Sequence, residues 1–292
     1  MNKSSVYLET IQRLYPDFPV YSIQTNTDGQ NNDILIVNDA FIFRFPKYID
    51  GVERLERECA LLKGIGDFIT LPIPHISFEQ IVDQTVGQVF LGYRIIPGVP
   101  LWRETVQNIC EEHILTSLAL QLAQFLRELH SIPSDVIHEQ PLPVADTYEE
   151  WRDIYTRIQM KCYPYMRLDA RLWATHHFET FLADSAHFAY KPVLKHGDFG
   201  PSNILFDAEK QVISGIIDFG GAGLGDPAYD FAGILSGYGE TFLRRFVAIY
   251  PEIEAFWDRI TFYQGTFALL EALFGIENQD QNAFESGIKE YV

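Results

Sequence analysis

Two short segments in the second half of the chain carry the residue types that phosphoryl transfer requires. They are His196-Gly-Asp-Phe-Gly-Pro-Ser-Asn203 and Ile217-Asp-Phe-Gly220. Phosphoryl transfer needs a carboxylate that orients or accepts the proton of an attacking hydroxyl, and oxygen ligands for magnesium on the nucleotide phosphates. We therefore expect Asp198 to be the catalytic carboxylate, and Asn203 and Asp218 to be the metal ligands.

The spacing of these residues strengthens that interpretation. The five-residue step from Asp198 to Asn203 equals the step in the protein-kinase catalytic loop, and Asp218-Phe219-Gly220 repeats the metal-binding tripeptide of kinases. Each match alone is weak, because such short patterns also occur by chance. Their order along the chain, with a predicted hairpin between them, favours phosphotransfer.

Three neighbouring polar residues are expected to be structural. A histidine two positions before the carboxylate usually packs beneath such a loop and bonds its backbone, so His196 is expected to do so. Asp226 and Asp230 belong to Gly225-Asp-Pro-Ala-Tyr-Asp230. An aspartate before proline and an aspartate in a first helical turn are ordinary capping residues, and we expect that role for both.

Hydrophobic patterning predicts the elements that position these residues. In the segment 40–46, Phe41, Phe43 and Phe45 share one face of a strand and Arg44 lies on the other. The remaining elements expected before the Pro97-Gly98 hinge are strands at 32–37, 75–78 and 88–96 and a helix at 53–63. Those expected after it are helical stripes at 115–129 and 253–270, and a small hairpin of 203–206 and 212–219. The pattern predicts an α+β protein with a small β-rich lobe, residues 1–96, and a larger, mainly helical lobe, residues 97–292.

Composition excludes several classes of protein. The chain has 292 residues, of which 22 are Lys or Arg and 40 are Asp or Glu, giving a net charge of −18. Such a field repels nucleic-acid backbones and attracts cations. Three widely spaced cysteines suit reduced thiols, and neither a secretory signal nor a membrane span is visible. We expect a cytoplasmic monomer that binds neither nucleic acid nor membranes.

At this point the chain resembles a known family. Its motifs, in order, are similar to those of the aminoglycoside phosphotransferase family, whose kinase-like relatives include choline, homoserine and macrolide kinases. The segments Phe43-Arg-Phe-Pro-Lys47 and Gly92-Tyr-Arg-Ile-Ile-Pro-Gly98 are most similar to the subgroup that phosphorylates the 2''-hydroxyl of gentamicin- and kanamycin-like drugs. The resemblance covers most of residues 20–275 and implies a protein-kinase-like bilobal fold that uses GTP or ATP with Mg²⁺.

The resemblance also implies roles for residues of the first lobe. Arg44 would contact the nucleotide phosphates in place of the usual lysine, with Glu58 paired to it. Arg94 to Ile96 would form the hinge whose backbone reads the base, and Tyr93 would lie at the mouth of the base pocket and favour GTP. The phosphate loop would be residues 25–32, including Gly29 and Asn32; it has a single glycine, so a plain polar hairpin is an equal alternative.

The acceptor is expected to be a small cationic molecule. Only a few residues separate Asp218 from Gly225-Asp226-Pro227, which leaves no room for a segment that docks a polypeptide. Members of the 2'' subgroup tend to carry acidic residues where this chain has Ser236-Gly237; Glu240 and Glu271 could replace them beside Asp198. The leading hypothesis is phosphorylation of an aminoglycoside, which would confer antibiotic resistance. The alternatives are a kinase of another small alcohol, of the choline, homoserine or macrolide type, and a nucleotide-binding pseudoenzyme.

Overall fold

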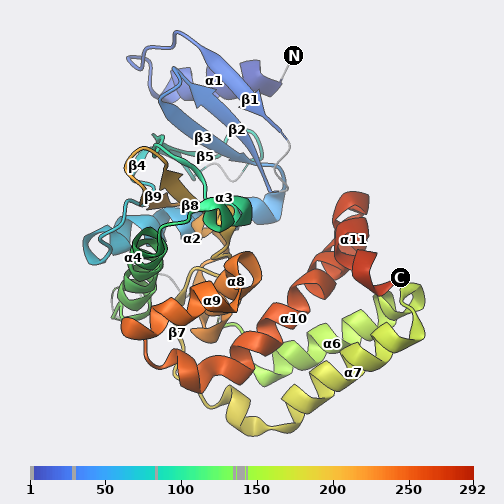
Figure 1. Ribbon diagram of the computed structural model, residues 1–292. Coiled ribbons are helices and arrows are strands. Elements are labelled where there is room, and N and C mark those ends of the chain that lie inside the picture. Colours follow the sequence, from blue (N-terminus) through green and yellow to red (C-terminus); the bar gives the residue numbers. More distant parts are fainter. Residues whose placement is uncertain (1–2, 28–30, 83–84, 134–135, 137–141, 143) are drawn as a thin grey trace. The chain divides into compact units, whose positions relative to one another are not determined.

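A computed structural model describes residues 3–27, 31–82, 85–133, 136, 142 and 144–292 (Figure 1). The chain forms two compact units. Unit 1 comprises Met1–Leu101, Ile132–Leu142 and Ser202–Ala222, and unit 2 comprises Trp102–Ser131, Pro143–Pro201 and Gly223–Val292. Unit 1 contains the large sheet and unit 2 most of the helices, which confirms the α+β class. The functional division at residues 96 and 97 stays a prediction.

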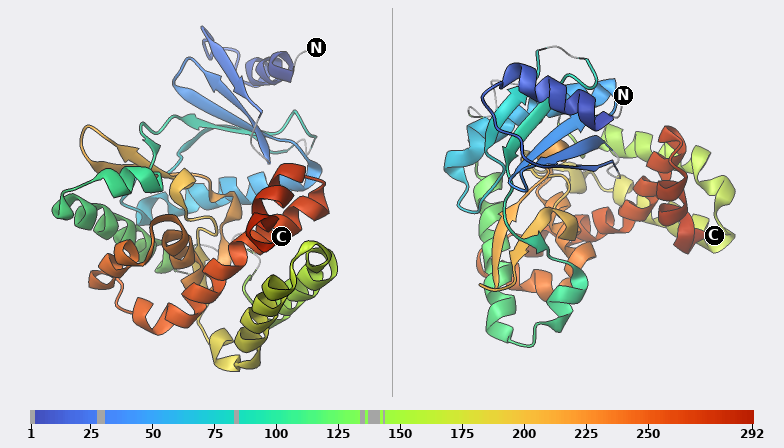
Figure 2. Two further views of the ribbon diagram at one scale, coloured as in Figure 1. Left: turned by 45° about the vertical axis from the view of Figure 1, so that its right-hand side comes forward. Right: turned by 90° about the horizontal axis from the view of Figure 1, so that it is seen from above.

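Unit 1 is built on a five-stranded antiparallel sheet with the strand order β1-β2-β3-β5-β4. The strands are β1 (Ile23–Asn26), β2 (Asn32–Val37), β3 (Phe41–Pro46), β4 (Ile76–Gln80) and β5 (Phe90–Arg94). Helix α1 (Lys3–Leu14), which the patterning missed, lies along this sheet (Figure 2). Its Tyr7 and Ile11 pack in one buried cluster with Phe43 and Phe45, as the alternation of β3 predicts.

The turn between β2 and β3 has the expected form. Asn38 and Asp39 both adopt positive φ, 56° and 50°, which is the conformation of a two-residue turn that matches strand twist. The resulting register pairs Ile34 with Arg44. The predicted hairpin is therefore confirmed, and it directs Arg44 away from the phenylalanine face.

Helix α2 (Ile49–Ile65) contains the expected helix at 53–63 and is longer at both ends. Its Leu55 and Cys59 pack with Val89 and Leu91, at and just before the start of β5. Glu58, next to Cys59, is also buried. The helix thus presents Glu58 from a well-anchored backbone.

The second hairpin is also present in unit 1. Strand β8 (Ile204–Asp207) pairs with β9 (Val212–Ile216), and β6 (Val99–Pro100) adds a third strand beside β8. The 3₁₀ segments of unit 1 include η1 (Gly66–Phe68) and η5 (Phe219–Gly221), while η4 (Pro201–Asn203) crosses the boundary between the units.

Unit 2 is mainly helical, and Figures 1 and 2 show α6 and α7 side by side. Its core joins Trp151 and Phe178 to Phe262 and Tyr263 of the long helix α10. The helices are α3 (Arg103–Asn108), α4 (Glu112–His130), α6 (Tyr148–Lys161), α7 (Leu168–Ala183), α8 (Ala228–Tyr238), α9 (Glu240–Leu243), α10 (Ile253–Asn278) and α11 (Gln281–Ile288). The two short strands are β7 (Val193–Lys195) and β10 (Gly223–Gly225), and the 3₁₀ segments are η2 (Tyr163–Tyr165), η3 (Ser185–Phe188), η6 (Arg244–Ala248) and η7 (Lys289–Tyr291).

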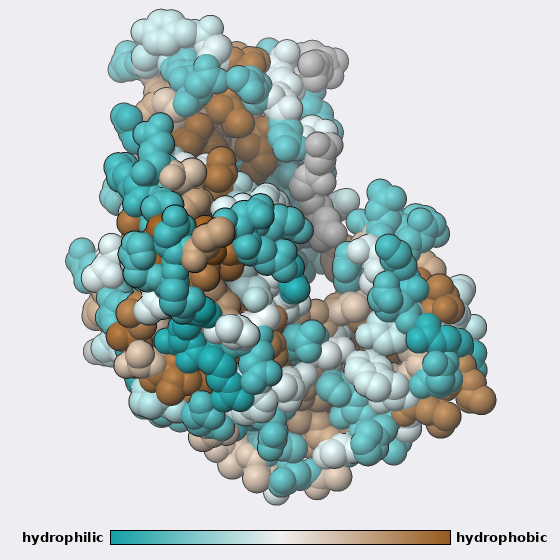
Figure 3. All heavy atoms as spheres, viewed as in Figure 1, coloured by the Kyte–Doolittle hydropathy of each residue, from teal (hydrophilic) through white to brown (hydrophobic). Residues whose placement is uncertain are grey.

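The surface agrees with the acidic composition. The face drawn in Figure 3 is mainly hydrophilic, with scattered hydrophobic patches. Exposed apolar side chains include Leu168 and Leu172 of α7. Within the described ranges, every helix is too short or too polar to cross a membrane.

Candidate active site

A buried ionic cluster joins β3, α2 and the Asp218 turn in unit 1. Arg44 Nη1 donates to Glu58 Oε1 at 2.5 Å, and Arg44 Nη2 donates to Asp218 Oδ1 at 3.0 Å. The side chains of Arg44 and Glu58 are almost fully buried, whereas that of Asp218 is 48% exposed. Burial works against the charge of Arg44, but the carboxylates of Glu58 and Asp218 outweigh it and raise the pKa of Arg44. The structure thus brings together three of the residues singled out in the sequence.

Tyr93 lies beside this cluster. It pairs with Ile42 across β3 and β5, and its side chain is buried. Burial raises the pKa of Tyr93 to about 12, while a hydrogen bond and the charge of Arg44 act in the opposite direction. The phenol therefore lies next to the guanidinium of Arg44, at the inner side of the predicted hinge.

The β8–β9 hairpin brings the two predicted metal ligands to one end. Ile204 pairs with Ile216, and Ile217 N donates to the carbonyl oxygen of Asn203 at 2.9 Å. Asp218 follows directly and adopts a left-handed conformation with φ 64°. Asn203 is buried, whereas the Asp218 carboxylate is half exposed and also accepts from Gly220 N.

These residues fit a magnesium ion that is bound together with nucleotide phosphates. Mg²⁺ prefers oxygen ligands and is usually held by one or two carboxylates plus phosphates and waters. Asp218 and Asn203 supply one carboxylate and one amide oxygen. Among the described residues there is no cluster of three His, Cys, Asp or Glu side chains that could enclose an ion. The donor set suits a shared site better than a metal cage made by the protein alone.

Asp198 belongs to unit 2 and is exposed, as a residue that meets a substrate must be. Its backbone N donates to His196 Nδ1 at 3.3 Å, and His196 is fully buried. The expectation that His196 packs beneath the loop and bonds its backbone is confirmed.

The two aspartates of the Gly225–Asp230 segment are buried and structural, as expected. Asp226 accepts from Ala228 N at 2.9 Å and also binds Arg259 Nε at 2.6 Å. Asp230 differs from the expectation of a helix cap, because it accepts from His196 N at 2.8 Å and from Gly197 N at 2.9 Å. It therefore holds the backbone just before Asp198.

Sequence reasoning missed a second anchor next to this loop. Lys195 Nζ lies 2.6 Å from Asp146 Oδ2 and 3.8 Å from the centre of the Tyr229 ring. Both charged side chains are buried. Burial raises the pKa of Asp146 to about 6, although Lys195 lowers it. The charge of Lys195 next to a functional motif was visible in the sequence, but its partner is 49 residues away.

The predicted acceptor carboxylates differ in their surroundings. Glu240 Oε1 accepts from Arg244 at 3.1 Å, and Arg244 also binds Glu254 at 2.9 Å. Glu271 lies exposed on α10. The charge of Glu240 is thus partly balanced by a neighbour on its own side of unit 2.

The predicted hinge and phosphate loop are described only in part. Arg94 ends β5 and stacks over Phe41 at 5.3 Å, and Ile96 lies against Gly215. Asn32 begins β2. Gly29 lies outside the described residues.

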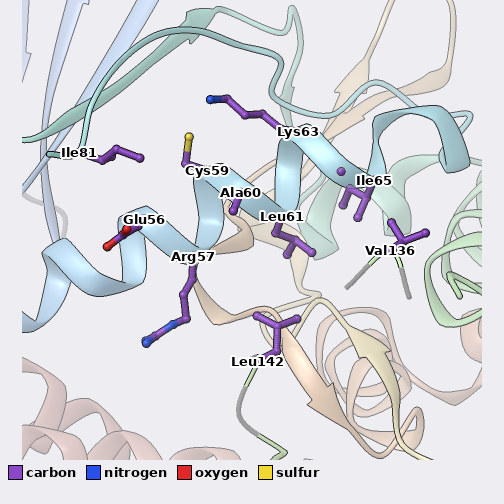
Figure 4. Close-up of a pocket in the computed structure, with 11 residues that line it drawn as sticks. Glu56, Arg57, Cys59, Ala60, Leu61, Lys63, Ile65, Ile81, Val136 and Leu142 are labelled. Atoms are coloured by element: carbon purple, nitrogen blue, oxygen red, sulfur yellow. The ribbon is translucent and has the colours of Figure 1, made fainter. Parts of the chain in front are cut away.

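A separate pocket of about 390 Å³ lies along α2 (Figure 4). Neither Arg44 nor Glu58 lines it, and neither do Asn203 and Asp218. Its lining includes Cys59, Leu61, Lys63, Ile65, Val136 and Leu142. This pocket is therefore distinct from the ionic cluster.

Comparison with known proteins identifies the class of fold. The solved structure of the GDP and kanamycin complex of APH(2'')-IIIa matches with a TM-score of 0.89 and 26% identity, covering 97% of this chain and 96% of that one. A macrolide 2'-phosphotransferase type I matches in fold, with a TM-score of 0.77 and 17% identity over 100% of this chain and 98% of that one. The protein has the kinase-like fold of the aminoglycoside phosphotransferases.

The sequence comparisons then give the family. Residues 22–263 match the phosphotransferase enzyme family, to which this chain belongs. Viomycin phosphotransferase of Streptomyces vinaceus is 31% identical over 287 residues, which is 97% of each chain. The protein is an enzyme that transfers a phosphoryl group to an alcohol, and the family resemblance seen in the motifs is confirmed.

Proposed function

We propose that this enzyme transfers the γ-phosphate of GTP or ATP, with Mg²⁺, to a hydroxyl of a cationic antibiotic of the aminoglycoside type. The observation that carries the proposal is the joining of Arg44, Glu58 and Asp218 in one ionic cluster, at the end of the hairpin that also carries Asn203. The cluster presents a cation for phosphates beside oxygen ligands for a metal. The similarity to the kanamycin-binding APH(2'')-IIIa supports the acceptor class.

Each residue then has a defined task. Asp198 orients the acceptor hydroxyl and takes its proton as the oxygen attacks the γ-phosphorus, and the bond from that phosphorus to the leaving nucleoside diphosphate breaks. Arg44, held by Glu58, binds phosphate oxygens with a guanidinium that donates in two directions. Asn203 and Asp218 would hold Mg²⁺, which supplies positive charge to the phosphates when bound.

The remaining residues serve binding. The backbone from Arg94 to Ile96 reads the base, Tyr93 closes the inner side of its pocket, and Gly29 and Asn32 frame the phosphate loop. Glu240 and Glu271 attract the ammonium groups of the acceptor, in keeping with the charge of −18. We propose that the enzyme acts as a cytoplasmic monomer without nucleic-acid or membrane partners.

Viomycin is the second candidate acceptor. One observation favours it: identity to viomycin phosphotransferase is 31% over almost the whole chain, above the 26% shared with APH(2'')-IIIa. The alternatives of another small-alcohol kinase and of a pseudoenzyme remain as outcomes of the same assay.

The test is a transfer assay with purified protein, Mg²⁺, and either GTP or ATP. The acceptors are kanamycin, gentamicin, viomycin, erythromycin, choline and homoserine, and both nucleoside diphosphate release and the phosphorylated acceptor are measured. We expect acceptor-dependent release with kanamycin or gentamicin. Product with viomycin alone would select the second candidate, and product with choline, homoserine or erythromycin alone would move the assignment to that class. Nucleotide binding without turnover on any acceptor would indicate a pseudoenzyme.

A further inference from the structure

Asp230 is the central anchor of the backbone before Asp198, and it has a third donor. The carboxylate is fully buried. Its Oδ1 accepts from Gly197 N, and its Oδ2 accepts both from His196 N and from His130 Nε2 at 3.1 Å. Two of the three donors belong to the loop, and the third comes from a side chain 100 residues away.

His130 lies at the end of α4 and is itself held on both sides. Its Nδ1 lies 3.3 Å from the hydroxyl of Tyr250, and its ring meets the edges of Phe231 and Tyr250. Arg127, one turn earlier on α4, lies over the Tyr250 ring at 4.0 Å. The imidazole thus has a defined orientation, with Nε2 directed at Asp230.

A buried carboxylate depends strongly on each donor. An ionised group without water must have its oxygens satisfied, and removing one partner of a buried charge is costly. Burial raises the pKa of Asp230, but the hydrogen bonds and charges of His130 and His196 outweigh it and hold the pKa below its ordinary value. Without the His130 donor, Oδ2 would lose one of its two partners, and its grip on the loop backbone would weaken.

We propose that His130 is a positioning residue for phosphotransfer, which holds Asp230 in place as the anchor of residues 196–198 and thereby sets the position of the Asp198 carboxylate. Tyr250 fixes the orientation of the imidazole. The inference rests on the proposed role of Asp198. A side chain that only filled space would need no nitrogen toward Asp230, whereas here both ring nitrogens face a polar partner.

The test compares His130→Leu, which keeps volume but removes the donor, with His130→Gln, which restores an N–H donor near the position of Nε2. Tyr250→Phe removes only the hydroxyl. The matched control is His177→Leu, because His177 Nε2 bonds the carbonyl oxygen of Phe262, away from Asp230. The measurements are kcat, the KM of each substrate, the thermal midpoint, and hydrogen exchange of the peptide covering residues 194–200.

We expect His130→Leu to lower kcat by about 10- to 100-fold with little change in either KM, because a small displacement of a catalytic group is costly. His130→Gln should recover most of this loss, and exchange of the His196 and Gly197 amides should rise in His130→Leu but not in His177→Leu. The proposal is overturned if His130→Gln is as slow as His130→Leu, or if kcat of His130→Leu stays within about twofold of wild type.

The two proposals fail in different ways. If the wild-type enzyme transfers phosphate to none of the acceptors, the proposed function fails, and the exchange measurement still decides whether His130 secures the loop. If wild type is active but exchange at residues 194–200 is the same in all variants, only the role of His130 is lost. Should His130→Leu not fold, His130→Gln and Tyr250→Phe provide the comparison.

Discussion

Arg44 and Asp218 are 174 residues apart in the chain, yet Nη2 of the arginine donates to Oδ1 of the aspartate at 3.0 Å. The same guanidinium binds Glu58 through Nη1. A lysine ammonium is a compact point charge, whereas the planar guanidinium donates in two fixed directions. The arginine in this chain therefore links the helix that carries Glu58 to the turn that carries Asp218.

The first prediction concerns the stability of this cluster. Arg44→Leu leaves Glu58 buried without its partner, and we expect the free energy of unfolding to fall by about 3–5 kcal/mol. The double variant Arg44→Leu/Glu58→Leu should be more stable than the single variant, because no unpaired charge remains. Urea unfolding measures both, and a double variant less stable than Arg44→Leu would contradict the argument. Arg44→Lys should keep most of the stability but raise the KM for the nucleotide.

The second prediction separates catalysis from metal binding. Asp198→Asn keeps the shape of the side chain but cannot accept the hydroxyl proton, so kcat should fall by ~100- to 10,000-fold with nucleotide affinity nearly unchanged. Asp218→Ala should instead weaken the binding of the nucleotide in the presence of Mg²⁺. Titration calorimetry and turnover on the same samples test both. Equal turnover in wild type and Asp198→Asn would remove Asp198 from the mechanism.

The third prediction is a pH dependence of stability that comes from Asp230. The pKa of this carboxyl is lower in the folded protein than in the unfolded chain, where it is about 3.9. Its contribution to stability is thus fully present well above that value and is lost as the pH falls through it toward the lower folded pKa. The difference in unfolding free energy between wild type and Asp230→Asn should shrink from pH 6 to pH 3. A difference that does not vary with pH would show that the folded pKa is not lowered.

The fourth prediction concerns the acceptor. If carboxylates attract a polycationic substrate, added salt should raise the KM for the acceptor more than the KM for the nucleotide. Glu271→Gln should raise the acceptor KM by about tenfold, the loss expected for a charge-assisted hydrogen bond. Glu240→Gln should have a smaller effect, because Arg244 already balances part of its charge. Glu254→Gln, which also touches Arg244, is the matched control; an equal effect of all three variants would indicate only general surface electrostatics.

The sequence was sufficient for local structure and insufficient for long-range polar partners. Alternation placed Phe43 and Phe45 in the core and Arg44 on the opposite face, because strand geometry is set by neighbouring residues. The partners of Lys195 and of His130 could not be predicted in this way. Each hydrogen bond depends on how distant helices and strands pack, and a lone Lys or His has no periodicity that would indicate it.

Helix α1 was missed for a related reason. Of its 12 residues only Tyr7, Thr10 and Ile11 are buried, so its apolar stripe is narrow. Tyr7 donates its hydroxyl hydrogen to Asp33 Oδ2 at 2.6 Å, so part of what holds the helix to the sheet is polar. Hydrophobic patterning cannot detect such an anchor, because an aspartate next to a strand looks like an ordinary turn residue.

The last prediction concerns the choice of nucleotide. Tyr93 is buried at the inner side of the predicted hinge, with its phenol beside Arg44. A bulky ring there should block the deeper adenine position and move the base outward, where guanine can use its own donors and acceptors to meet the backbone of Arg94 to Ile96. We therefore expect a higher kcat/KM with GTP than with ATP in the wild type.

Two variants test this role of the ring. Tyr93→Ala should open the pocket and recover the use of ATP. Tyr93→Phe separates the two functions of the side chain, because it keeps the ring but removes the hydroxyl that contacts Arg44. We expect Tyr93→Phe to retain the preference for GTP, with any loss of activity shared equally by both nucleotides. If wild type already uses ATP better, or if Tyr93→Ala leaves the preference unchanged, the ring does not control the base. Tyr93 would then act only through its contact with Arg44.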